Sequence, residues 1–247
     1  MLESGRARRS PCLHLSQPPN HTMPEQTLLN EHPRTIPGID PDGLPILGIG
    51  LGLTGLTLGL RPRFVALPLA LTALAALFYR DPQRATPHEP GVIFAPADGT
   101  VLRVEEVYEH RFIHSDCLRL SVRIAPLDVP VCRSPVAGTV QMVEHVAGEF
   151  RPTDDREAGE SNERIYIGIQ TDWGPLMVTL VAGPFGRRLV CRVTPGDRLE
   201  PGTRLGTARF GARADLYVQR DTPYLTAVAG DRLLAGVTRL GEVLPRS

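Results

Sequence analysis

The chain has 247 residues, enough for one large domain or two small ones. Its 27 basic and 27 acidic residues balance, so no bulk electrostatic field favours nucleic acid as a partner. All the basic residues are arginine, which excludes a lysine Schiff base, a lipoyl-lysine or biotinyl-lysine arm and a P-loop lysine. The four cysteines are widely spaced, so we expect reduced thiols and no metal site.

Residues 1–43 are rich in Pro, His, Asn and Thr and show little apolar periodicity. This composition predicts a disordered N-terminal extension. Met1–Asn20 is polar and carries arginine, so it lacks the apolar segment of a secretory signal. Met23 is a second candidate for the start of the protein, and the sequence leaves the choice open.

Two adjacent uncharged segments follow. Leu44–Leu60 is strongly apolar, Arg61-Pro62-Arg63 interrupts it, and Phe64–Tyr79 continues it. A membrane span needs roughly 20 apolar residues, so each segment is marginal alone. Together they predict a helical hairpin over residues 44–79 that enters the bilayer as two short spans or as a re-entrant anchor. The alternative is a buried helix pair of a soluble protein, although globular cores rarely contain two such segments.

Arginines stand on both sides of the second apolar segment. Arg61 and Arg63 favour a cytoplasmic tip of the hairpin, whereas Arg80 and Arg84 favour a cytoplasmic main domain. We expect the hairpin to anchor the protein in the cell membrane, with the main domain at the cytoplasmic face.

Residues 80–247 have the pattern of a single, mainly β domain. Leu118–Ile124 alternates apolar and polar residues without a break, and Ile165–Gln170, Met177–Val181 and Leu189–Val193 are strand-like as well. Turn residues separate these segments at short intervals, and no window shows a helical stripe.

Two internal repeats run through this domain. Pro96–Val101 recurs as Pro135–Val140, and Gly196–Gly206 recurs as Gly230–Gly241. The first pair contains a Gly-Thr-Val segment, which begins a strand, and the second pair begins with Gly-Asp, which forms a tight turn. The set resembles the half-motifs of barrel-sandwich hybrids, the fold of lipoyl and biotinyl domains. Those carriers need a lysine at a hairpin tip, so a carrier function is excluded.

The segment Ala147–Glu163 is polar, with Phe150 as its only large apolar residue. It is predicted to be a long exposed loop, either a solvated insertion or a mobile flap near a site.

Over residues 44–240, the chain resembles short bacterial members of the phosphatidylserine decarboxylase family. The segments that carry this resemblance appear in the family's order; they are Phe78–Pro82, Ala95–Val101, Ala125–Arg133, Asn162–Arg164, Arg187–Cys191 and Arg209–Leu216.

The resemblance implies a self-cleaving precursor. In the family, a serine after a glycine attacks the preceding carbonyl, and β-elimination releases the upstream chain. The serine becomes a pyruvoyl group, which is the electron sink for decarboxylation of phosphatidylserine to phosphatidylethanolamine. A histidine acts as the base toward the serine, and an aspartate orients the histidine.

Carried over residue by residue, Asp98 matches the family aspartate, Pro130 stands where the histidine is expected, and Ala212 stands where the serine is expected. The cleavage site would be Gly211-Ala212. Proline accepts no proton through its side chain and alanine has no hydroxyl, so we expect no pyruvoyl cofactor and no family-type catalysis. The closest Gly-hydroxyl pair is Gly206-Thr207.

Of the seven histidines, three are candidates for an alternative base: His110, His114 and His145. Arg187, Arg188, Arg209 and Arg213 are candidates for a lipid headgroup site, because arginine binds phosphate with two parallel hydrogen bonds. The alternative is that these arginines form structural ion pairs with Asp and Glu in the domain.

Three functions therefore stay open. The protein is an inactive family member that binds phospholipid or assembles with an active paralogue, or it is an active decarboxylase that uses another nucleophile or base. The third reading is a membrane-anchored β module without lipid specificity.

Overall fold

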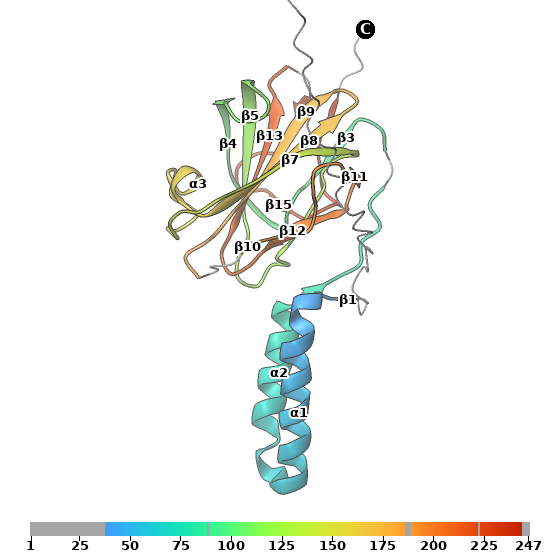
Figure 1. The fold of residues 1–247 in the computed structure, drawn as a ribbon, viewed down its shortest axis with the longest axis vertical. Helices are drawn as coiled ribbons and strands as arrows, with labels where there is room; N and C mark the ends of the chain where they lie inside the picture. Colours follow the sequence, from blue (N-terminus) through green and yellow to red (C-terminus); the bar gives the residue numbers. More distant parts are fainter. Residues whose placement is uncertain (1–37, 88, 186–188, 222, 244–247) are drawn as a thin grey trace, which may run out of the picture. The chain divides into compact units, whose positions relative to one another are not determined.

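The computed structural model describes residues 38–87, 89–185, 189–221 and 223–243. The strand β1 (Gly38–Ile39) pairs antiparallel with β2 (Arg80–Asp81), and a 3-10 turn (Pro41–Gly43) follows β1. Between β1 and β2 lie two helices, α1 (Leu44–Leu60) and α2 (Ala66–Phe78), joined by a second 3-10 turn (Pro62–Phe64) (Figure 1). Residues 38–43, within the extension expected to be disordered, are therefore ordered, and residues 1–37 lie outside the described part.

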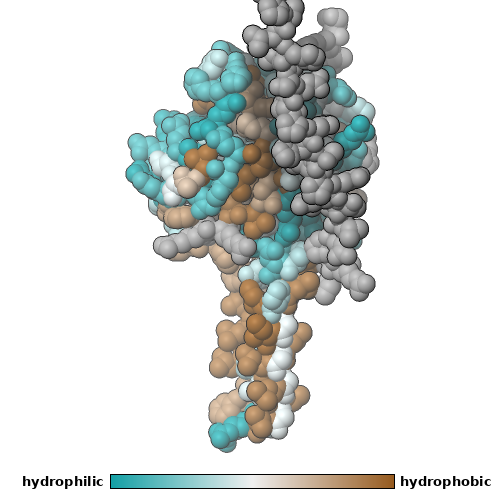
Figure 2. All heavy atoms as spheres, viewed as in Figure 1, coloured by the Kyte–Doolittle hydropathy of each residue, from teal (hydrophilic) through white to brown (hydrophobic). Residues whose placement is uncertain are grey.

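The helices α1 and α2 pack against each other and leave apolar side chains in contact with solvent. A Cβ added at Gly50 would lie 2.4 Å from the Thr72 hydroxyl, so glycine permits the close approach of the helices. Leu51, Leu60 and Leu67 are more than half exposed, and Figure 2 shows the resulting apolar surface along the hairpin. The helical segment Pro41–Leu60 is long and apolar enough to cross a membrane, and Pro62–Phe78 is a shorter apolar segment.

The rest of the described chain is mainly strand, which confirms the predicted fold class. An eight-stranded antiparallel sheet curls into a half-barrel in the order β11-β7-β8-β9-β13-β5-β4-β15 (Figure 1). Its strands are β4 (Gly99–Glu109), β5 (Ser115–Arg123), β7 (Gly138–Val146), β8 (Arg164–Thr171), β9 (Gly174–Val181), β11 (Arg198–Leu199), β13 (Arg213–Gln219) and β15 (Arg232–Leu233).

Two small sheets complete the domain. One has the order β10-β12-β6 and the other β14-β16-β3. Their strands are β3 (Val92–Phe94), β6 (Val131–Arg133), β10 (Leu189–Cys191), β12 (Arg204–Ala208), β14 (Pro223–Leu225) and β16 (Arg239–Val243).

The internal repeats of the sequence form equivalent strand pairs. Thr100 at the start of β4 faces Arg232 of β15, and Thr139 at the start of β7 faces Arg198 of β11. Gly99 and Gly138, which precede these threonines, are needed for close packing. A Cβ added at Gly99 would lie 2.0 Å from the Arg123 carbonyl oxygen. At Gly138 it would lie 2.6 Å from the Gln170 carbonyl oxygen.

The large sheet has one apolar and one polar face. Leu120, Leu216, Val178 and Ile167 point into the main hydrophobic core. The residues that alternate with them along the strands face the other way; Arg119, Ser121, Thr179, Arg213, Asp215 and Tyr217 belong to this polar face.

The loop Ala147–Glu163 is exposed at about half of its residues, as predicted, but Gly159 packs against the Arg213 guanidinium, so the loop also covers part of this polar face. It contains the short helix α3 (Ala158–Ser161), and Thr153, Ala158 and Asn162 are buried. Asn162 Nδ2 donates to the carbonyl oxygens of Arg151 and Ala182, both at 2.9 Å.

A buried ion pair attaches the segment after α2 to the β domain. Asp81 is 1% exposed, and its Oδ1 accepts a hydrogen bond of 2.8 Å from Nη2 of Arg133 in β6. Arg204 of β12 forms a second ion pair with Asp81. The segment is therefore fixed to the small β10-β12-β6 sheet.

We expect Asp81→Ala to lower the free energy of unfolding by about 3–5 kcal/mol, because it leaves buried arginine charge uncompensated. The matched control is Asp154→Ala, since the Asp154–Arg123 pair has side chains 59% and 45% exposed and should contribute less than about 1 kcal/mol. Urea unfolding of the full chain in detergent measures both. Equal effects of the two substitutions would contradict the assigned role of Asp81.

Candidate functional site

The segment that resembles the family's cleavage site forms a tight turn between β12 and β13. Phe210 and Gly211 both have positive φ, 58° and 77°. The Gly211 carbonyl is closely packed, because a Cβ added at Gly183 would lie 2.0 Å from the Gly211 oxygen. The Thr153 hydroxyl donates a hydrogen bond of 3.2 Å to the same oxygen. The carbonyl that a family serine would attack is therefore fixed in position.

Ala212 follows this carbonyl and is completely buried in the apolar core. Its own carbonyl accepts a hydrogen bond of 2.9 Å from the Ile124 amide. The position thus offers a methyl group in apolar surroundings, with no oxygen to attack the Gly211 carbonyl.

Pro130 lies in the loop between β5 and β6, beside the same turn. The Pro130 carbonyl accepts a hydrogen bond of 2.9 Å from the Ala208 amide at the end of β12. One end of the loop thus binds Ala208, and the other binds Ala212 through Ile124. The fold therefore places Pro130, where the family histidine is expected, at one end of this loop, and Ala212, where the family serine is expected, against its other end. Neither position carries the side chain of the family mechanism.

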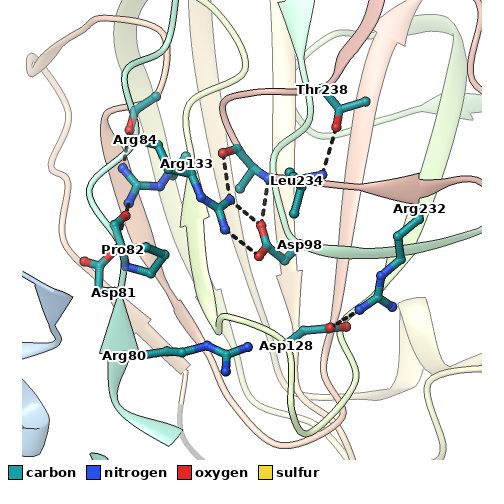
Figure 3. Close-up of polar contacts among 12 residues, drawn as sticks. Arg80, Asp81, Pro82, Arg84, Asp98, Asp128, Arg133, Arg232, Leu234 and Thr238 are labelled. Carbon is teal, nitrogen blue, oxygen red and sulfur yellow. Dashed lines mark hydrogen bonds and ion pairs between the residues drawn. The ribbon is translucent and has the colours of Figure 1, made fainter. Parts of the chain in front are cut away.

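Asp98 lies in the turn before β4 and is tightly held. Arg84 Nη1 and Nη2 donate to Asp98 Oδ1 and Oδ2 at 2.5 Å and 2.7 Å, and the Ala235 amide donates to Oδ1 at 2.8 Å (Figure 3). The carboxylate is 5% exposed. Its hydrogen bonds to Arg84 raise the pKa of that guanidinium. Both carboxylate oxygens therefore serve a structural ion pair.

The loop between β5 and β6 is fixed by further contacts. Asp128 accepts from the Ala125 amide at 2.8 Å and forms an ion pair with Arg232 of β15. Arg80 donates to the Leu127 carbonyl at 2.7 Å. The Pro130 position is thus held in a defined conformation next to the turn.

The alternative bases lie elsewhere. His110 and His114 belong to the turn after Glu109, at the opposite end of the 11-residue strand β4 from Asp98. His145 is exposed, and its Nε2 lies 2.9 Å from Glu163 Oε1. Among the described residues, no group of three or more His, Cys, Asp and Glu could hold a metal ion.

The alternative nucleophiles are also poorly placed. Thr207 lies within β12 and is 1% exposed, with its hydroxyl 3.5 Å from Asp40 Oδ2. Burial, and then the nearby Asp98 charge, raise the pKa of the Cys132 thiol to about 12, so this thiol is protonated at neutral pH.

Two of the headgroup candidates form ion pairs instead of lining an open site. Arg213 is fully buried, and its Nε and Nη2 each donate to Asp215 at 2.7 Å. Arg209 Nη2 donates to Asp40 at 2.7 Å and to Asp42 at 3.1 Å. Arg187 and Arg188 lie outside the described residues.

The Arg209 contacts join the turn to the base of the hairpin. Asp40 and Asp42 stand directly before α1, the Arg209 guanidinium lies 5.1 Å from the Tyr79 ring centre, and the ring centres of Phe78 and Phe210 are 5.5 Å apart.

Sequence reasoning missed Arg84, Asp40 and Thr153 as neighbours of the site. No local pattern distinguishes them, since their partners lie far away in the chain.

Comparisons with known proteins agree with this geometry. A profile described as phosphatidylserine decarboxylase matches residues 71–241. A phosphatidylserine decarboxylase proenzyme of Symbiobacterium thermophilum is 39% identical over 208 residues, which cover 84% of this chain and 96% of the relative. Proteins with the same name from Mycobacteroides abscessus and Desulfotalea psychrophila are 38% and 34% identical. These two matches cover 85% and 82% of this chain, and 89% and 95% of the relatives.

We expect Ala212→Ser alone to leave the chain uncut, because Pro130 supplies no base for the new hydroxyl. A general base contributes about 10²–10⁴-fold to such a step, so Ala212→Ser with Pro130→His should cut measurably faster. Denaturing gel electrophoresis detects cleavage before residue 212. Pro130→His alone is the control. Efficient cleavage of the Ala212→Ser single variant would contradict the role assigned to position 130.

Proposed function

Because the chain belongs to the phosphatidylserine decarboxylase family, we propose that it is an uncleaved member that forms no pyruvoyl group and does not decarboxylate phosphatidylserine. The observation that carries this proposal is the buried methyl group of Ala212 beside the fixed Gly211 carbonyl. The pyruvoyl precursor needs a hydroxyl at this position, and alanine cannot supply it.

The residues around the turn do not fit the pyruvoyl group. The Thr153 hydroxyl contacts the turn, but it donates its hydrogen bond to the Gly211 oxygen and does not precede or follow that residue in the chain. Attack by Thr153 would move the acyl group to a distant side chain and could not convert residue 212 to pyruvoyl. Asp98, bound to Arg84 and Ala235, has no histidine at position 130 to orient.

We infer that the protein instead acts as a phospholipid-binding protein, alone or assembled with an active paralogue. In this proposal, the hairpin anchors the chain in the cell membrane and the β domain lies at the cytoplasmic face. Support comes from the apolar exposed surface of α1 and α2 and from the Arg209 contacts with Asp40 and Asp42. These contacts hold the turn against the base of the anchor, where a headgroup would be met.

The purified full chain should release no CO2 from phosphatidylserine in mixed micelles. The same assay on the Ala212→Ser, Pro130→His double variant is the comparison, because that variant regains both side chains of the family mechanism. If the natural chain still released CO2 after contaminating decarboxylase had been removed, the proposal would be contradicted. The reaction would then require another nucleophile or base.

Vesicle flotation tests the binding part. Phosphatidylserine added to phosphatidylcholine vesicles should strengthen binding, and Arg187→Ala and Arg188→Ala should each weaken it about fivefold, since an arginine that binds close to an anionic membrane contributes about 1 kcal/mol. Arg198→Ala, at an exposed position of β11, is the control. Binding that ignores both headgroup and arginines would favour an anchored β module without lipid specificity.

A further inference from the structure

A second concave site lies on the polar face of the large sheet. A cavity of about 730 Å³ opens between the β4–β5 turn and α3. Its walls include Arg119 of β5, Arg164 and Tyr166 of β8, Met177 of β9 and Tyr217 of β13. Arg164 is in register with Val181, and Val181 with Arg213, so Arg164 lies two strands, roughly 10 Å, from the residue after Ala212. The cavity opens on the polar face of the sheet, however, whereas Ala212 faces the apolar core. The cavity is therefore separate from the turn at Gly211.

Arg164 is a buried cation whose contacts are all neutral. It is 9% exposed, Nε donates to the Tyr166 hydroxyl at 2.6 Å, and Nη1 donates to the Asn162 carbonyl at 2.8 Å. No carboxylate within the described ranges forms an ion pair with it. Burial of a charge without a counter-ion is costly, so this position is suited to a ligand that brings the negative charge.

Other donors line the same cavity. The Arg119 Nε is buried and has no hydrogen-bond partner, while its Nη2 donates to Glu105 at 2.6 Å. The Arg111 guanidinium lies 4.5 Å from the Tyr166 ring centre. Burial, followed by the Asp215 charge, raises the pKa of Tyr217, so its hydroxyl stays protonated and can donate a hydrogen bond.

The acidic groups of the lining do not cancel these donors. Glu109 accepts hydrogen bonds of 2.6–2.9 Å from the amides of Arg111, Phe112 and Ile113, so its charge is used within its own turn. Glu160 is exposed, so water screens its charge. The interior of the cavity thus presents N–H and O–H donors to an anion.

We propose that this cavity binds a phosphate group of a small soluble molecule, with Arg164 as the main ligand. Guanidinium groups match phosphate oxygens in charge and in planar hydrogen-bond geometry. The cavity has the size of small-molecule sites, so the ligand extends beyond the phosphate, with its remaining part against Tyr166, Met177 and Tyr217. This site is independent of the function proposed for the turn at Gly211.

The test uses the full chain in detergent and calorimetric titration with inorganic phosphate at constant ionic strength. Phosphate should bind saturably, and Arg164→Gln should raise the dissociation constant at least about tenfold. Arg239→Gln is the matched control, because Arg239 is 54% exposed in β16 and outside the cavity, so binding should not change. Absence of phosphate binding, or equal binding by Arg164→Gln, would overturn the proposal.

Two further measurements keep the test decisive. Tyr217→Phe should also weaken phosphate binding while it preserves packing, so the site can be tested even if Arg164→Gln unfolds. Glycerophosphoserine should bind with the same dependence on Arg164, whereas flotation with phosphatidylserine vesicles should not depend on it. Vesicle binding that needs Arg164, together with no binding of soluble phosphate compounds, would show that a bilayer lipid is the ligand and that the soluble-ligand proposal is wrong.

Discussion

The ion pair between Arg209 and Asp40 joins the apolar hairpin to the turn that contains Gly211. Asp40 stands directly before the apolar hairpin, and Arg209 stands two residues before Gly211, where family members cut themselves. Both side chains are largely buried, so the pair is strengthened by low local dielectric but would be costly to break. The Phe78–Phe210 ring contact adds an apolar connection at the same place. Hairpin and turn are therefore one structural unit.

This unit is complete although the side chains of self-cleavage are missing. The loop between β5 and β6 still bridges Ala208 and Ala212, and the Gly211 carbonyl is still fixed by Thr153 and by the glycine at position 183. The scaffold does not need the serine or the histidine for its own packing, because Ala212 fills an apolar space, and Pro130 is buried and accepts the Ala208 hydrogen bond through its backbone carbonyl. Such a scaffold can keep its fold while it serves the binding role proposed above.

Much of the fold could be predicted because its signals are local. The two Gly-Thr-Val segments and the two Gly-Asp turns repeat in sequence, and they form the equivalent pairs of β4 with β15 and of β7 with β11. The uncharged segments around Arg61-Pro62-Arg63 likewise indicated a helical hairpin. The polar segment Ala147–Glu163 was predicted in part, since about half of its residues are exposed, whereas the burial of Thr153, Ala158 and Asn162 depends on long-range contacts that polarity does not reveal. Arg213 and Asp215 alternate on one strand, and this spacing was the available sign that they pair with each other. The Arg84–Asp98 contact had no such sign, because turn geometry brings these residues together.

The mass of the purified full chain under denaturing conditions distinguishes an uncut chain from a self-processed one. We expect one uncut chain of about 27.0 kDa. Two fragments divided after Gly211, the smaller containing the 36 residues from Ala212 to Ser247 (247 − 211), would show that self-processing occurs without the serine and would contradict the account.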